Sequence, residues 1–437
     1  MADRNTIVTY RGLADAFSPS QADDAGNEVV PAENPLLLAR RAAQRITSDP
    51  AEQVELVARF SSAMSELRAA EAEAGPGVLA SPQSKDASVL QSFLYEIPEG
   101  SRNEVESDAD ELTFAPDDLG GWFLSLFQWF KRLHKRDQRP PTSTTPETIA
   151  DNANIFIVAD WGTGLYGAPV IADTIKRQGG FEVLLHLGDV YYAGTKKEVQ
   201  DRFLDKWPKS AGRISRALNS NHEMYSGGEG YFDLTLPAFN QPFNYFAMAN
   251  KNWLLICLDS GYHEHTVDDE QAEWVENVIA QHGANRSVLL FSHHQLFSLY
   301  DSQGPKLARQ LHKVLTSGKV VAWYCGHEHR CVLYNPHPIY KLRLRCLGHG
   351  GMPCKRENFS GLSSTPTDEA DTVWYQVPAR DLVPGGLVLD GPNREIKESP
   401  QTYGPNGYMT LEFAGAKLIE RVFSPTGVEL WNGELPA

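Results

Sequence analysis

Beyond residue 150, short apolar segments alternate with amphipathic segments. The apolar segments are rich in β-branched and aromatic residues and lie at 154–159, 182–187, 253–258, 287–291 and 319–325. Between them, 167–178 and 268–281 carry apolar residues at helical spacing. This alternation predicts an α/β fold, in which buried strands form a sheet and helices cover its faces.

The first 150 residues follow a different pattern. Apolar residues recur there at steps of three and four, at Val54, Val57, Phe60, Met64 and Leu67. The series begins after Asp49-Pro50 and stops at the Gly-Pro-Gly of 75–77, which predicts one helix. Acidic residues then dominate 96–118, as is typical of a solvated or partly disordered connector.

A second helix, amphipathic and rich in aromatic residues, is predicted over 122–133. Packing of its apolar face against the main domain is the simpler interpretation, because exposed aromatic faces promote aggregation. Basic residues over 131–139 favour an alternative, in which 122–139 contacts a membrane surface or a protein partner. The Pro- and Thr-rich segment 139–147 is typical of a linker. We therefore expect a mainly helical, partly disordered region over 1–150 and a second domain over 151–437.

Composition excludes several classes of protein. With 40 basic and 56 acidic residues, the net charge of −16 disfavours bulk nucleic-acid binding. No apolar stretch is long enough to span a membrane, and the N-terminus does not resemble a signal peptide, so we expect a cytoplasmic protein. The five cysteines form no C-x-x-C pair, which disfavours a disulfide framework or a thiolate zinc site.

Potential metal ligands follow five of the predicted strands. They are Asp160, Asp189, Asn221, His293 and the pair His327 and His329. The first ligands of successive motifs are separated by 29, 32, 72 and 34 residues, and one βαβ unit needs about 30. We therefore expect these side chains to meet at the carboxyl ends of neighbouring strands.

The residue types indicate a pair of metal ions. Two such ions need one bridging carboxylate, with imidazole, amide and carboxylate ligands completing each site. The absence of cysteine among them disfavours structural zinc. Hydrolysis of a phosphoester, by attack of a metal-held hydroxide on phosphorus, is the chemistry we expect.

The motif order D-x-G, G-D-x-x-Y, N-H-E, H and G-H-x-H resembles the calcineurin-like metallophosphoesterase superfamily and, within it, the purple acid phosphatases. The resemblance covers about 155–350, and Gly407–Phe413 resembles the closing strands of that family, whereas 1–150 has no counterpart. It implies an α/β sandwich of two mixed sheets flanked by helices.

The resemblance also implies metals and their ligands. It implies Fe(III) and a divalent Fe, Zn or Mn ion. The ferric site would be held by Asp160, Tyr192 and His329, the divalent site by Asn221, His293 and His327, and Asp189 would bridge the two. Gly162 stands where the wider superfamily has the histidine of D-x-H, and Tyr192 can supply the missing ligand. The alternative is that Tyr192 is packed in the loop beside a Zn or Mn pair; the adjacent Tyr191 could equally be the packed residue.

His222 resembles the catalytic histidine that contacts the phosphate or protonates the leaving group. Ser220 departs from the G-N-H pattern, and a serine would adopt a positive φ reluctantly. His294 and His349 are candidates for the outer shell of the site, with a purely structural role as the alternative for each.

Three functions remain open from sequence. The leading one is a phosphatase acting on small phosphomonoesters. The second is a phosphodiesterase acting on cyclic nucleotides, glycerophosphodiesters or lipid head groups. The third, of another class, is a partner-binding scaffold on the same fold. The seven potential metal ligands argue against it, because a scaffold would not need them.

Overall fold

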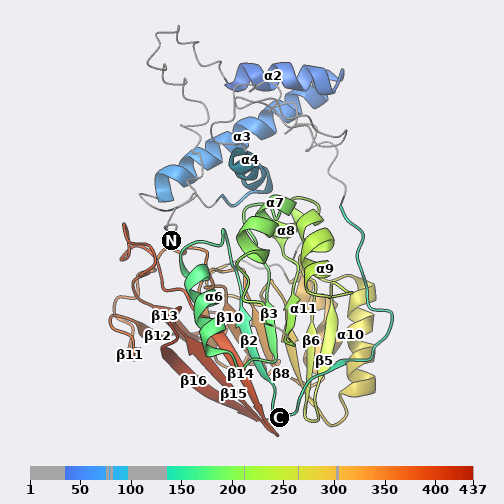
Figure 1. Cartoon of the computed structure of the whole chain (residues 1–437), viewed down its shortest axis with the longest axis vertical. Coiled ribbons are helices and arrows are strands. Elements are labelled where there is room, and N and C mark those ends of the chain that lie inside the picture. Colours follow the sequence, from blue (N-terminus) through green and yellow to red (C-terminus); the bar gives the residue numbers. More distant parts are fainter. Residues whose placement is uncertain are drawn as a thin grey trace. The chain divides into compact units, whose positions relative to one another are not determined.

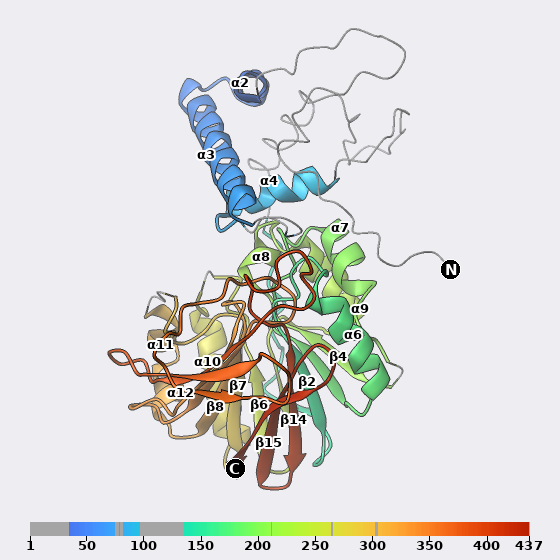
Figure 2. The ribbon, with the colours of Figure 1, turned by 90° about the vertical axis from the view of Figure 1, so that its left-hand side faces the viewer.

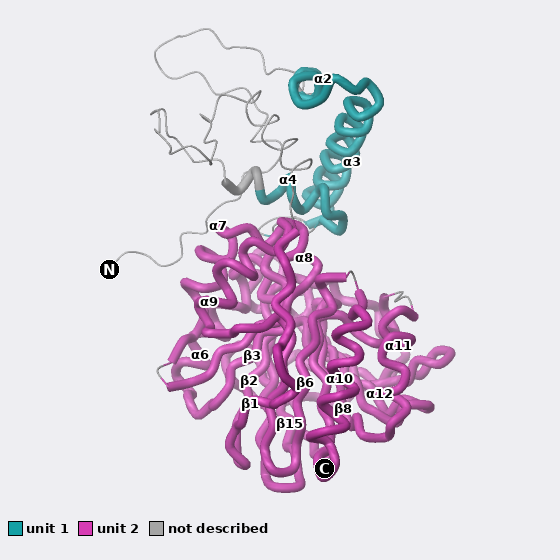
Figure 3. Tube along the Cα trace, turned by 90° about the vertical axis from the view of Figure 1, so that its right-hand side faces the viewer, with its two compact units in different colours: residues 1–134 teal, residues 135–437 magenta. Residues whose placement is uncertain are grey.

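The computed structural model describes residues 35–74, 78, 82–96, 135–210, 212–263, 265–301 and 305–436 (Figure 1). The chain divides into two compact units, unit 1 over 1–134 and unit 2 over 135–437 (Figure 3). None of the helices in these described ranges is long and apolar enough to cross a membrane.

Unit 1 is helical in its described part. It contains α2 (Pro35–Ile46), α3 (Pro50–Ala74) and α4 (Lys85–Glu96). The predicted helix is α3, which begins at Pro50 and buries Phe60, Met64 and Leu67. Val54 was predicted on this apolar face but is 71% exposed, because Leu56 occupies the buried position of that turn. Of the predicted acidic connector 96–118, Glu96 is the last residue of α4, and the rest lies outside the described residues, as does the predicted aromatic helix 122–133.

Unit 2 contains two mixed sheets. The ten-stranded sheet has the order β1, β5, β6, β7, β8, β10, β9, β13, β12, β11, and the six-stranded sheet has the order β16, β15, β14, β2, β3, β4. The strands of the first sheet are β1 (Glu147–Thr148), β5 (Phe246–Ala249), β6 (Trp253–Cys257), β7 (Ser287–Phe291), β8 (Val320–Cys325), β9 (Cys331–Tyr334), β10 (Arg343–Leu347), β11 (Ser364–Pro366), β12 (Val373–Val377) and β13 (Gly386–Asp390). Those of the second are β2 (Asn154–Val158), β3 (Val183–His186), β4 (Ile214–Ala217), β14 (Tyr408–Ala414), β15 (Lys417–Phe423) and β16 (Glu429–Pro436).

The sheets pack face to face, with helices on both outer faces (Figure 2). The longer helices are α6 (Gly167–Gln178) against the six-stranded sheet and α10 (Asp269–His282) against the ten-stranded sheet. Ile155 and Ile157 of β2 point into the core between the sheets, while Phe156 and Val158 point to the α6 side. Burial of both faces explains why the strand reads as a continuous apolar run. The predicted α/β sandwich of two mixed sheets is confirmed.

The shorter helical segments of unit 2 lie in the connections between its strands. They are α7 (Lys196–Glu198), α8 (Asn221–Met224), α9 (Leu236–Ala238), α11 (Lys306–Gln310) and α12 (His312–Thr316), with π-helical turns at Val199–Leu204 and Tyr231–Thr235.

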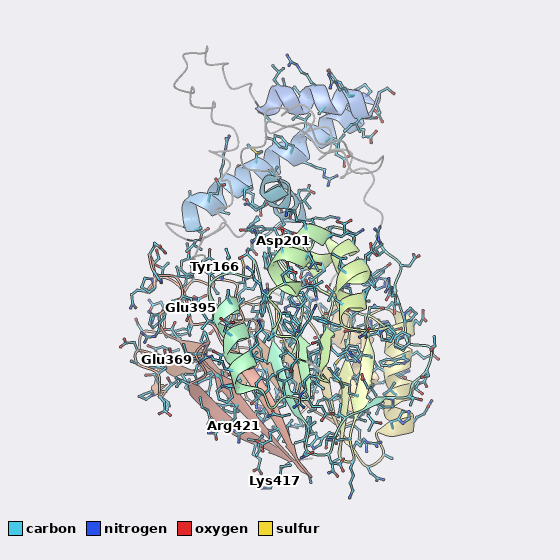
Figure 4. All side chains as sticks on the ribbon, in the orientation of Figure 1. Tyr166, Asp201, Glu369, Glu395, Lys417 and Arg421 are labelled. Atoms are coloured by element: carbon cyan, nitrogen blue, oxygen red, sulfur yellow. The ribbon has the colours of Figure 1, made fainter. Side chains whose placement is uncertain are left out.

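The closing strands protect one edge of the six-stranded sheet. Antiparallel β14 pairs with β2, and β15 and β16 extend the sheet beyond it. Lys417 and Arg421 of β15 are labelled in Figure 4. They form ion pairs with residues of the two neighbouring strands, Lys417 with Glu434 and Arg421 with Glu412. Glu434 lies on the edge strand β16, and charges on an edge strand are a common safeguard against pairing with another chain.

The segment predicted as a linker, 139–147, runs along unit 2 together with 135–138. We call residues 135–146 the strap. Arg136 forms an ion pair with Asp233 at 2.9 Å, and the Arg139 N–H donates to Asn244 at 2.8 Å. The Lys135 ammonium lies 3.7 Å from the centre of the Tyr262 ring. The strap therefore belongs structurally to unit 2.

Candidate metal centre

The motif residues meet because their strands end at one edge of the sandwich. Asp160 follows β2 and Asp189 follows β3, which pair in parallel, while His293 follows β7 and His327 follows β8, which also pair in parallel. The two sheets face each other, so both pairs of strand ends face one place. This arrangement brings five of the seven predicted ligands into one cluster: Asp160, Asp189, His293, His327 and His329.

Asp189 lies at the centre of the cluster. Its Oδ1 is 3.2 Å from His293 Nε2, and its Oδ2 is 3.7 Å from His329 Nε2. Two groups of potential ligands share this carboxylate: the first is Asp160, Asp189 and His329, and the second is Asp189, His293 and His327. Within each group the ligand atoms lie within 4.8 Å of one another. Asp189 thus occupies the position of a bridge.

The first group surrounds Asp160. Asp160 Oδ1 is 3.5 Å from His329 Nε2, and its carboxylate accepts a hydrogen bond of 2.9 Å from the His327 N–H. Gly326 passes so close that a Cβ there would lie 2.2 Å from Asp160 Oδ2. The glycine of the G-H-x-H motif is therefore needed for the backbone to approach the carboxylate.

In the second group, hydrogen bonds fix the orientation of the side chains. His293 Nδ1 is 2.9 Å from the Leu187 carbonyl, which can only accept, so Nδ1 carries the proton and Nε2 presents its lone pair toward Asp189. His293 Nε2 is also 3.2 Å from His327 Nδ1. Two ligands of one ion, bound at right angles, lie about 3 Å apart, so these spacings suit coordination.

Asn221 is oriented by two neighbours. Its Nδ2 donates to the Tyr225 hydroxyl at 2.9 Å, and its Oδ1 lies 3.2 Å from His294 Nε2. Ser220 precedes it with φ −130° and caps α8 by accepting the His222 N–H. The turn therefore does not need a positive φ at Ser220, and a serine fits there without strain.

His222 lies on the side of the first group. Its Nδ1 is 2.6 Å from the Tyr192 carbonyl, so this nitrogen donates and Nε2 is left for other partners. The ring stacks on Tyr191 with centroids 3.8 Å apart, and the Tyr191 hydroxyl is 2.8 Å from His329 Nε2. Burial lowers the pKa of His222 and outweighs the opposite effect of Asp189.

The two adjacent tyrosines have different surroundings. Tyr191 brings its hydroxyl to His329, and burial followed by the charges of Asp189 and Asp160 raises its pKa well above the usual range. Tyr192 is fully buried and packs edge-on against Tyr191. The contact with His329 thus comes from Tyr191, whereas the resemblance assigns the ferric ligand to Tyr192.

The two outer-shell candidates lie in different places. His294 is fully buried next to Asn221 and the second group, and its Nδ1 is 2.9 Å from the Ser260 hydroxyl. The His349 imidazole instead contacts the Leu347 carbonyl at 3.1 Å and lies against Gly407.

Electrostatics indicate that the cluster is built for cations. Asp189 is fully buried, and in the described part of the chain neither of its oxygens receives a hydrogen bond. Burial alone would raise the pKa of Asp189, but the charges of His293 and His222 take it well below its usual range. Burial and the charge of Asp189 raise the pKa of Asp160 well above its usual range. Two buried carboxylates this close need a neutralising cation, so the residues fit metal binding.

The histidines are suited to the same task. Burial lowers the pKa of His293 to about 4, and it takes the pKa of His327 well below its usual range with the added effect of His293. Both imidazoles are therefore neutral near pH 7, which is the form that binds metals.

Sequence reasoning missed three residues around the cluster. Glu223 accepts the N–H groups of Asp189 and Val190, each at 3.2 Å, and Glu198 accepts the Tyr192 N–H at 2.6 Å. Both had a signal in the sequence: Glu223 stands in the N-H-E motif, and Glu198 is the last residue of a T-x-x-E capping box that begins at Thr195. His265, the third, packs against His294 and His327 and had no motif to mark it.

Comparison with solved structures found distant similarities. PhoD is 10% identical with a TM-score of 0.37, over 67% of this chain and 73% of that chain. An uncharacterized protein from Streptococcus pneumoniae TIGR4, described as a predicted phosphoesterase, is 8% identical with a TM-score of 0.29, over 66% and 99%. Vacuolar protein sorting 29 from Cryptosporidium parvum is 8% identical with a TM-score of 0.32, over 65% and 99%. No curated protein matches the chain.

A comparison with protein families found a match within unit 2. Residues 153–331 match the model of the calcineurin-like phosphoesterase family, and this range contains all five motifs. Unit 2 therefore contains a calcineurin-like metallophosphoesterase domain, as the motifs predicted.

Proposed function

We propose that this protein hydrolyses small phosphomonoesters at two metal ions that share Asp189, in the manner of purple acid phosphatases. The observation that carries the proposal is the Asp189 carboxylate, which is buried, receives no hydrogen bond from the described residues, and directs one oxygen toward each group of histidines. A scaffold without metals would leave this charge uncompensated, at a large cost in stability.

The residues divide into two ligand sets. Asp160, His329 and a neighbouring tyrosine would hold Fe(III), since a phenolate is a hard, anionic donor. Asn221, His293 and His327 would hold a divalent Fe, Zn or Mn ion. Two ions held here would supply Lewis-acid activation of the phosphoester and of water.

His222 would serve the substrate directly. The Tyr192 carbonyl holds its Nδ1, so that Nε2 is the nitrogen able to contact the phosphoryl group or to give a proton to the leaving oxygen. The stacked Tyr191 ring restrains the imidazole on its other side.

Two further aspects belong to the proposal. We place the protein in the cytoplasm, which cell fractionation with an antibody would test. A contact of 122–139 with a membrane surface or a protein partner also stays a prediction, and Lys135 and Arg136 of that segment are already engaged with Tyr262 and Asp233.

Metal analysis and paired assays test the function. Purified protein is expected to contain two equivalents of metal and to hydrolyse p-nitrophenyl phosphate faster than bis(p-nitrophenyl) phosphate. Faster cleavage of the diester would replace the phosphatase with a phosphodiesterase, and absence of metal would favour the scaffold.

Asp189→Asn gives the sharpest variant. We expect it to lose at least one ion and to lower turnover by orders of magnitude, because one oxygen of the bridge becomes a neutral amide. Its circular dichroism spectrum should match the wild type. The exposed Asp368→Asn is the matched control and should retain metal and activity. Two ions and a near-normal rate in Asp189→Asn would refute the assignment.

A further inference from the structure

His265 belongs to a group of three histidines at the divalent side of the centre. Its ring centroid is 4.0 Å from that of His294 and 5.3 Å from that of His327. One nitrogen from each of the three rings lies within 4.8 Å of the others. His265 comes from the loop 259–268, between β6 and α10, which carries none of the five motifs.

The loop is anchored at its start by a buried carboxylate. Asp259 Oδ1 accepts the N–H groups of Gly261 at 3.0 Å and Tyr262 at 2.9 Å, and its Oδ2 accepts Asn244 Nδ2 at 2.6 Å. The His265 N–H then donates to the Ser260 carbonyl at 3.1 Å. These bonds hold His265 at φ 64°, a conformation that costs a non-glycine residue about 1–2 kcal/mol. This strained conformation occurs at the residue whose ring contacts His294 and His327 beside the metal cluster.

Residues of the strap form hydrogen bonds with Tyr262, His263 and Asp268 of this loop. Gln138 Nε2 donates to Asp268 at 2.9 Å and lies 3.1 Å from His263 Nε2, while the Tyr262 hydroxyl donates to the Arg136 carbonyl at 2.8 Å. Asp268 also caps α10 by accepting the Gln271 N–H. The loop is therefore fixed at both ends, and the position of His265 is set in advance.

His265 differs from its two neighbours in what surrounds its nitrogens. His294 is fully buried between Ser260 and Asn221, and His327 Nδ1 faces His293. His265 is partly exposed, and its ring nitrogens form no hydrogen bond with the residues that the structure describes. The imidazole is thus fixed in place and still has hydrogen-bonding capacity for a ligand.

The two ends of the cluster each have a histidine beside them. The His222 ring stacks on Tyr191, whose hydroxyl contacts His329 of the first group. The His265 ring contacts His294 and also His327, which belongs to the second group. We propose that His265 is a substrate-binding residue that donates a hydrogen bond to a phosphoryl oxygen at the divalent side. The inference rests on the proposed function and adds a specificity residue to it.

Binding of inorganic phosphate, the product of any phosphomonoesterase, is the direct probe. In calorimetry on metal-loaded protein, His265→Ala should lower the affinity for phosphate about ten- to a hundredfold. This factor corresponds to the loss of one hydrogen bond to a charged group. The metal content should stay at the wild-type value. KM for p-nitrophenyl phosphate should rise by a similar factor, with a smaller change in kcat.

Two further variants complete the test. His265→Asn keeps a hydrogen-bond donor and should recover part of the phosphate affinity. His312→Ala, an exposed histidine on α12, should behave as the wild type. Unchanged phosphate affinity in His265→Ala would overturn the inference, and so would loss of an ion, which would make His265 a metal ligand. Failure of the proposed function has a different signature, because the wild-type protein would then cleave no phosphomonoester.

Discussion

At the scale of single residues, the two nitrogens of each imidazole have separate tasks. In His293 and His222, a backbone carbonyl holds Nδ1 and thereby assigns the second nitrogen to the site. Such second-sphere bonds fix both the tautomer and the ring orientation. The carbonyls come from Leu187 and Tyr192, on either side of Asp189 in the chain, so one loop positions the bridging carboxylate and two imidazoles.

The role of His222 can be tested through the leaving group. If it protonates the departing oxygen, His222→Ala should lower kcat far more for an alkyl phosphate than for p-nitrophenyl phosphate, since p-nitrophenolate leaves without a proton. Steady-state kinetics on both substrates give the comparison. Equal losses would instead assign His222 to binding of the phosphate.

The tyrosine at the proposed ferric site can be identified by colour. A phenolate bound to Fe(III) absorbs visible light by charge transfer, whereas Zn or Mn in the same place leaves the protein colourless. Family resemblance assigns the phenolate to Tyr192, while the hydroxyl that contacts His329 belongs to Tyr191. On this geometry we expect iron-loaded Tyr191→Phe to lose the band and Tyr192→Phe to keep it. The reverse result would return the assignment to Tyr192, and a colourless iron-loaded wild type would exclude both.

At the scale of elements, two buried carboxylates hold the loop that follows β3. Glu223 accepts the first N–H groups of this loop, and Glu198 accepts those of Tyr192, Ala193 and Thr195. Burial and the charge of Asp189 raise the pKa of Glu223 to about 8. The loop that carries the bridging aspartate is thus shaped by side chains from two later segments of the chain.

Glu198→Ala should destabilise this loop strongly. It removes the acceptor of three buried N–H groups, and one buried group left without a partner costs about 1–3 kcal/mol. We expect the free energy of unfolding to fall by about 3 kcal/mol or more in urea denaturation, together with weaker metal retention. Glu198→Gln, which keeps one acceptor oxygen, should lie between, and the exposed Glu398→Ala should change neither quantity. A wild-type unfolding curve for Glu198→Ala would show that the loop is held by other contacts.

At the scale of the whole of unit 2, the two sheets are joined by a buried ion pair as well as by their apolar core. Arg345 of β10 and Glu420 of β15 form two hydrogen bonds of 3.0 and 2.9 Å, and the Tyr324 hydroxyl donates to the same carboxylate at 2.9 Å. Both charged side chains are almost completely buried. The pair links β10 of the ten-stranded sheet to β15 of the six-stranded sheet. Tyr324, which joins it, lies on β8, the strand that precedes His327 of the metal cluster.

Breaking this pair should cost about 3–5 kcal/mol, because Glu420→Ala leaves a buried guanidinium without its partner. Chemical denaturation should show the loss, and the double variant Arg345→Met with Glu420→Leu should recover much of it. Lys417→Ala on the same strand removes only an exposed pair and should cost less than about 1 kcal/mol. Similar losses for Glu420→Ala and Lys417→Ala would contradict a special role for the buried pair.

Local patterns in the sequence determined much of this molecule. Alternating apolar and amphipathic segments predicted the α/β sandwich, and the helix after Pro50 followed from spacing and its Gly-Pro-Gly end. The ligand types at strand ends predicted a clustered site, because parallel strands deliver their carboxyl ends to one edge.

Tertiary structure decided what depends on side-chain direction and on contacts between distant segments. Tyr191 meets His329, Gln138 of the strap holds the loop of His265, and His349 turns toward Gly407, and each of these contacts joins residues that are far apart in the sequence. Spacing along a chain fixes which face an element buries, whereas the partner across a loop or a second sheet is set only when the whole core packs.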